Sequence, residues 1–76
     1  MKQAVEKIVK SLVGNADAVE VSEKSDGRST VIQVRVGEGD MGRIIGREGR
    51  TVKAIRSLLF HAGQKQRKRF VLELAD

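Results

Sequence analysis

The sequence of 76 residues contains no cysteine, proline, tryptophan or tyrosine, and only one histidine. Without cysteine there is no disulfide framework and no thiolate metal site, and one histidine cannot form a histidine cluster. We therefore expect no metal and no other cofactor. No apolar run approaches the roughly 20 residues that span a bilayer, and the N-terminus lacks the apolar core of a signal peptide. These absences predict a soluble, cytoplasmic protein.

Aromatic side chains are also scarce, because Phe60 and Phe70 are the only phenylalanines. RRM and OB folds bind single strands of nucleic acid by stacking bases on exposed rings. Both phenylalanines are assigned to the hydrophobic core, so a binding surface built on aromatic rings is not expected.

Positive charge is concentrated in one part of the chain. Residues 1–40 carry six lysines and arginines against seven acids, whereas residues 41–69 carry nine against Glu48 alone. Such clustering is typical of a protein that binds a polyanion. The alternative is an ordinary solvated surface.

The first half of the chain contains one helical pattern and two alternating ones. Apolar residues recur at helical spacing over residues 2–13, which Gly14 and Asn15 end. They alternate with polar residues over 18–23 and again over 30–36. The turn sequence of residues 25–28 joins these two segments, so we predict a β-hairpin.

The second half predicts two helices and a strand. Asp40 is a candidate N-cap for a short helix through Ile45. A second helix is expected over residues 50–62, ended by Gly63, and a strand over residues 70–74. The predicted apolar face of the second helix consists of Val52, Ile55, Leu58, Leu59 and Ala62.

The predicted order is thus α-β-β-α-α-β. It corresponds to an α+β fold in which helices pack on one face of a three-stranded sheet. Residues 1–76 are long enough for one such domain.

Between the two predicted helices lies the turn Gly46-Arg47-Glu48-Gly49. Glycine allows unusual dihedral angles and close approach of the backbone, and the turn leads into a helix N-terminus, which favours an anion. Arg47 and Arg50 add positive charge there. The turn is therefore a candidate clamp for a nucleic-acid backbone, although a tight helix–helix turn without a ligand has the same pattern.

Other functions of the glycine-rich segment are not supported. The segment lacks the Gly-Lys-Ser/Thr ending of a P-loop, and the chain has no Gly-x-Gly-x-x-Gly fingerprint. No activated nucleophile or metal-ligand set is present, and His61 has no catalytic context. We therefore do not expect an enzyme.

Residues 44–55 resemble the signature of the KH domain, with residues 46–49 as its GXXG loop. The order of elements resembles the type II, prokaryotic form. The resemblance covers the whole chain and is closest to the small free-standing bacterial KH RNA-binding proteins of the KhpA type.

This resemblance implies a protein that binds single-stranded RNA and acts as an RNA chaperone or post-transcriptional regulator. It also implies a homodimer, or a heterodimer with another KH-containing protein. RNA would lie in a groove with the GXXG loop on one side. The last strand would form the opposite wall of that groove, and the basic residues 67–69 would lead into this wall. The implied RNA-binding residues are Arg43, Ile44, Ile45, Gly46, Arg47, Glu48, Gly49, Arg50, Val52 and Lys53.

Two questions stay open at the level of sequence. Glu48 brings an acid into the phosphate clamp, where it either points outward or pairs with a neighbouring arginine. The competing function is a protein-interaction or ribosome-associated assembly module, in which contact with RNA is incidental.

Overall fold

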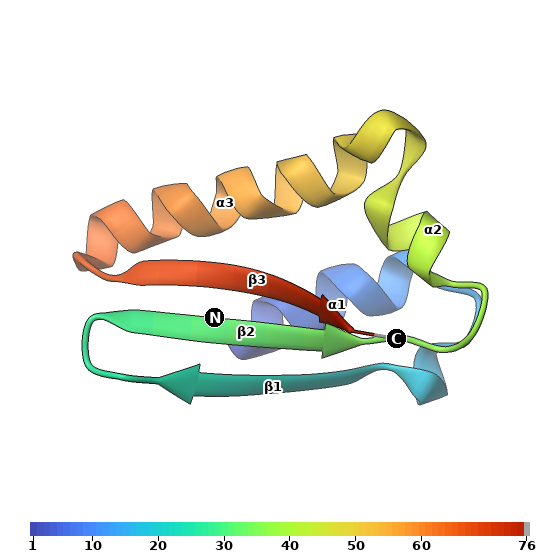
Figure 1. Cartoon of the computed structure of the whole chain (residues 1–76), viewed down its shortest axis with the longest axis horizontal. Helices are drawn as coiled ribbons and strands as arrows, with labels where there is room; N and C mark the ends of the chain where they lie inside the picture. Colours follow the sequence, from blue (N-terminus) through green and yellow to red (C-terminus); the bar gives the residue numbers. More distant parts are fainter. Residues whose placement is uncertain (76) are drawn as a thin grey trace.

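Three strands form one sheet in the computed structural model of the chain, which describes residues 1–75 (Figure 1). The elements along the chain are α1 (Lys2–Leu12), β1 (Glu20–Ser25), β2 (Ser29–Arg35), α2 (Met41–Ile45), α3 (Arg50–Gln66) and β3 (Arg69–Ala75). Short 3-10 turns lie at Ala16–Ala18 and Arg47–Gly49. The predicted order and the α+β class are confirmed.

The sheet has the order β1-β2-β3 and is mixed. The predicted hairpin is confirmed, since β1 and β2 pair antiparallel from Glu20 opposite Arg35 to Ser25 opposite Thr30. β3 pairs parallel with β2, from Ser29 opposite Arg69 onward. A parallel partner requires the chain to cross back over the sheet, and α2 and α3 make that crossover. The crossover places the two ends of α3 at opposite ends of the sheet (Figure 1).

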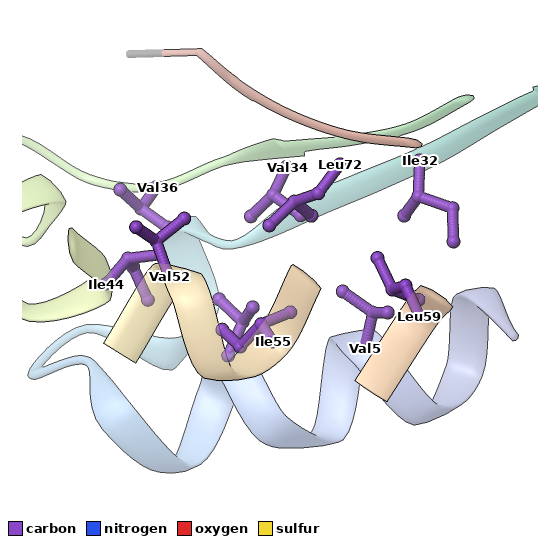
Figure 2. Close-up of a cluster of buried hydrophobic side chains, with 10 residues drawn as sticks. Val5, Ile32, Val34, Val36, Ile44, Val52, Ile55, Leu59 and Leu72 are labelled. Atoms are coloured by element: carbon purple, nitrogen blue, oxygen red, sulfur yellow. The ribbon is translucent and has the colours of Figure 1, made fainter. Parts of the chain in front are cut away.

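The core lies between one face of the sheet and the helices. Alternating strand residues point down onto α1 and α3 in Figure 2, and the helices supply the facing side chains. The buried apolar residues are Val5, Val9, Ile32, Val34, Val36, Ile44, Val52, Ile55, Leu59 and Leu72. None of the helices within residues 1–75 has the length and apolarity required to cross a membrane.

The helix α3 is longer than predicted, because Gly63 lies inside it and does not end it. A Cβ atom on Gly63 would overlap the carbonyl oxygen of Lys68, so glycine here permits close approach of the chain that leads into β3. The helix ends at Gln66, where the N–H groups of Arg67 and Lys68 donate to the carbonyls of Gln64 (3.3 Å) and Gly63 (2.8 Å). This pair of bonds, with Arg67 in the left-handed region, is a Schellman motif.

The apolar face of α3 is narrower than predicted. Its buried stripe is Val52, Ile55, Leu59 and Gly63, while Leu58 is 58% exposed and Phe60 is 60% exposed. The core assignment of Phe60 is therefore wrong, because position 60 lies outside this stripe. Phe70 is partly buried and packs against the core, as predicted.

Asp40 occupies the predicted N-cap position of α2, but its carboxylate makes no capping hydrogen bond. The carboxylate instead accepts hydrogen bonds from the backbone N–H groups of Gly14 (3.1 Å) and Asn15 (3.3 Å). These groups belong to the loop after α1. Asp40 is only 7% exposed, so it ties that loop to the start of α2.

Candidate nucleic-acid interface

Three of the four residues in the turn between α2 and α3 have a positive φ. Gly46 ends α2 at φ 77° and ψ 174°, and Gly49 precedes α3 at φ 74°. Glu48 between them is also left-handed, at φ 57°. A side chain on Gly46 would overlap Thr51, whose backbone nitrogen lies 2.9 Å from the position that a Cβ atom would occupy. Gly46 is thus required by both conformation and space.

The N-terminus of α3 has no side-chain cap. Gly49 N–H donates to the carbonyl of Gly46 (3.2 Å), and Arg50 N–H donates to the carbonyl of Arg47, which tightens the turn. The following N–H groups of the first helical turn have no intrahelical acceptor, because every helix leaves such groups at its start. Together with the helix dipole they favour an anion at this end of α3.

Four exposed cationic residues lie close to these N–H groups along the chain. Arg47 follows Gly46 directly, and Arg50 opens α3 with 78% of its side chain exposed. Arg43 lies one helical turn earlier, with its Nε atom 3.7 Å from a carboxylate oxygen of Asp40. Lys53 is exposed in the first part of α3. Arg47, Arg50 and Lys53 can turn toward an anion near the turn without leaving a buried partner, whereas Arg43 would leave the buried carboxylate of Asp40.

Glu48 points into solvent, and its Oε2 atom lies 3.7 Å from an Nη atom of Arg50. Both side chains are at least 74% exposed, so this ion pair contributes little to stability. The carboxylate of Glu48 is therefore held only weakly by Arg50, and an approaching phosphate can displace it.

The apolar residues expected near the turn divide into core and surface. Ile44 is fully buried and Val52 is 7% exposed, so both hold the turn onto the core from beneath. Ile45 is 39% exposed and offers apolar surface directly before Gly46. Of the expected apolar residues, Ile45 alone can contact a ligand without rearrangement of the core.

The basic residues 67–69 do not lie beside the turn. They follow the C-terminus of α3, and this helix of 17 residues is about 25 Å long. Arg69 N–H donates to the carbonyl of Arg28 in the β1–β2 hairpin (3.1 Å), which places the connector at the far end of the sheet (Figure 1). The turn and the connector are thus two separate cationic regions.

Phe60 lies on the exposed side of α3, although its residue type predicted a place in the core. It lies four residues after Arg56 and seven after Lys53, both of which are exposed. Residues three or four apart share one side of a helix. That spacing to exposed cations was the available signal that Phe60 faces away from the core.

The comparisons with known proteins agree across almost the whole chain. The family model described as KhpA/KhpB, KH domain matches residues 2–74. The chain is 46% identical over 76 residues to RNA-binding protein KhpA of Halalkalibacterium halodurans, with both chains covered completely. It is 45% identical over 74 residues to RNA-binding protein KhpA of Clostridium acetobutylicum, covering 97% of this chain and 99% of the relative. The protein of the same name from Aquifex aeolicus is 40% identical over 76 residues, covering 96% of that relative. No solved structure was found to match.

Proposed function

We propose that this chain, which belongs to the KhpA/KhpB KH-domain family, binds single-stranded RNA at the turn of residues 46–49 and catalyses no reaction. The match to the family and the order of elements confirm the resemblance to a type II KH domain. The relatives named RNA-binding protein KhpA support RNA as the ligand. We treat residues 1–76 as one such domain.

The observation that carries the proposal is the uncapped N-terminus of α3 beside a left-handed glycine turn with exposed arginines. The backbone N–H groups and the side chains of Arg47 and Arg50 hold phosphates, and Ile45 contacts a base or ribose. GXXG loops clamp four backbone nucleotides. Since phosphate contacts dominate, binding is weak for one small module and falls steeply with salt.

A second copy or another KH-containing protein raises this weak affinity through avidity. A groove of about 270 Å³ between α1 and α3 supports such pairing, because its lining is almost entirely apolar and includes the exposed Leu58. We therefore propose a homodimer or a heterodimer with another KH protein, which acts in the cytoplasm as an RNA chaperone or post-transcriptional regulator. Sedimentation of the wild type and of Leu58→Asp tests the homodimer.

The clamp is tested by replacing Arg47 and Glu48 together with aspartate. Both side chains are exposed, so the circular dichroism spectrum stays unchanged, while the added negative charge abolishes binding to single-stranded RNA in a titration across salt concentrations. The matched control is Lys7→Asp with Glu6→Asp on α1. It changes the net charge of the protein by the same amount, but at positions far from the turn in the sequence.

Unchanged RNA affinity in the turn variant would overturn the clamp. If the wild type itself shows no salt-sensitive binding to free RNA, the competing assembly-module function is favoured.

A further inference from the structure

A second cationic region lies at the opposite end of α3 from the glycine turn. The second half of α3, the connector of residues 67–68, the start of β3 and Arg28 line an open hollow of about 800 Å³. Five cations line it, namely Arg28, Arg56, Arg67, Lys68 and Arg69. In Figure 1 this is the end at which α3 runs into β3 and the β1–β2 hairpin turns.

The charges around this hollow have no acidic partners within residues 1–75. The ion pairs of this part of the chain involve Lys10, Arg43 and Arg50. No acid is among the residues that line the hollow. Five clustered cations without neutralisation favour an anionic ligand.

The hollow also contains an exposed aromatic ring. Phe60 is 60% exposed and lines the hollow together with Phe70 and Gly63. The ring of Phe60 meets His61 only at its edge, with centroids 5.6 Å apart and planes at 70°. An open ring beside cations is the combination that holds a base and its phosphate in single-stranded nucleic acid.

One side of α3 connects the glycine turn to this hollow. Lys53, Arg56, Phe60 and Gln64 follow Gly49 at intervals of four, three, four and four residues. Residues at these intervals are neighbours along the helix surface. A Cβ atom on Gly49 would lie 3.9 Å from Cε of Lys53, so the stripe begins at the turn itself.

We propose that this stripe is an RNA track. A strand that leaves the turn follows Lys53 and Arg56 along α3, and a base stacks on Phe60 while its phosphates meet the cations of the hollow. The track rests on the proposed function and extends it, because it assigns this chain a preference for RNA longer than the four nucleotides of the loop. An acidic peptide would satisfy the cations but would leave the aromatic ring without a stacking partner.

The experiment compares two single-stranded RNAs at fixed salt. One is a tetranucleotide, the length that the loop clamps, and the other has about 12 nucleotides, within the range of single-strand site sizes. The longer RNA contains several overlapping four-nucleotide sites, and this number alone raises its apparent affinity. The wild type binds the longer RNA about tenfold more tightly than this statistical factor predicts. Phe60→Leu keeps an apolar side chain but removes stacking, and it abolishes this gain while tetranucleotide affinity stays unchanged.

Arg56→Ala lowers affinity for the longer RNA and reduces the slope of log affinity against log salt by about 0.7. Lys65→Ala is its matched control, because Lys65 is an exposed cation of α3 that does not line the hollow. Sedimentation at the same concentrations shows that Phe60→Leu leaves the oligomeric state unchanged.

Several outcomes contradict the track. Equal loss with Lys65→Ala indicates a general effect of charge, and a Phe60→Leu variant that changes only oligomeric state assigns the ring to a protein contact. An unchanged length preference in both track variants also overturns the inference, while the proposed function stands. Absence of binding to either RNA by the wild type overturns the proposed function as well.

Discussion

The two ends of α3 use similar residues in opposite electrostatic settings. Each end is bordered by a residue other than glycine in the left-handed region, Glu48 at φ 57° and Arg67 at φ 54°. A glycine at or near each end is approached closely by another residue: Thr51 lies against Gly46, and the carbonyl of Lys68 lies against Gly63.

The difference lies in the backbone groups that each end exposes. The N-terminus presents N–H groups and the positive end of the dipole, so the backbone itself attracts phosphate. The C-terminus presents carbonyl groups, and two of these are already satisfied by the N–H groups of Arg67 and Lys68. An anion can therefore bind there only through side chains. We therefore name the proposed site at the turn the backbone site and the proposed site in the hollow the side-chain site, and substitutions can separate them.

The largest effect is expected for Gly46→Ala. Gly46 has φ 77° and ψ 174°, a backbone conformation that residues with a side chain rarely adopt. A Cβ atom at this position would lie 2.7 Å from Cβ of Thr51. Strain and overlap together cost about 3 kcal/mol of unfolding free energy, and RNA binding at the turn is lost. Thermal denaturation and a titration with tetranucleotide RNA measure both.

The control for this prediction is Gly49→Ala. Its φ of 74° is also left-handed, but only the Lys53 side chain lies within 4 Å of a Cβ atom. The loss of stability is then limited to about 1 kcal/mol. Equal losses in the two variants would show that the overlap with Thr51 is relieved and that the turn is less constrained than its geometry indicates.

These two glycines show which features could be predicted from the sequence. Periodicity identified the helices and strands, because the spacing of apolar residues depends on which face is buried. The two glycines identified the turn. The sequence did not show that Gly46 is more tightly packed than Gly49, since the close approach of Thr51 to Gly46 exists only in the folded chain.

The errors have the same origin. Gly63 matched a helix stop, yet the helix continues to Gln66, and the chain that turns back after it brings the carbonyl of Lys68 so close to position 63 that glycine is required there. Phe60 was assigned to the core by its residue type, although α3 buries only a narrow stripe against the sheet. Asp40 was assigned to a local cap, but its carboxylate accepts hydrogen bonds from the N–H groups of Gly14 and Asn15, which are distant in the sequence. Sequence therefore predicted the presence and position of the turn better than the surroundings of Phe60, Gly63 and Asp40.

The second prediction concerns Arg67→Gly at the side-chain site. Glycine removes the left-handed strain, so the free energy of unfolding rises by about 0.5 kcal/mol. Denaturation at high salt measures this rise, because salt screens the interaction of Arg67 with the helix dipole. Affinity for the longer RNA falls by up to about fivefold, since an exposed ion pair with a phosphate contributes up to about 1 kcal/mol. A gain in stability without loss of affinity would show that Arg67 serves the helix end and not RNA.

The smallest effect on RNA affinity is expected for Glu48→Gly at the backbone site. The change removes left-handed strain, which stabilises the fold by up to about 1 kcal/mol, and it removes the one acid of the turn. Repulsion between an exposed acid and a phosphate in water amounts to about 0.5 kcal/mol, so RNA affinity rises two- to threefold at low salt. Glu48→Gln separates the two causes, because it raises affinity equally but keeps the strain. Glu23→Gln on β1 has the same change in net charge far from the turn. If it raised affinity as much as Glu48→Gln, the acid at position 48 would act only through the net charge of the protein, and the backbone site would tolerate Glu48 at no local cost.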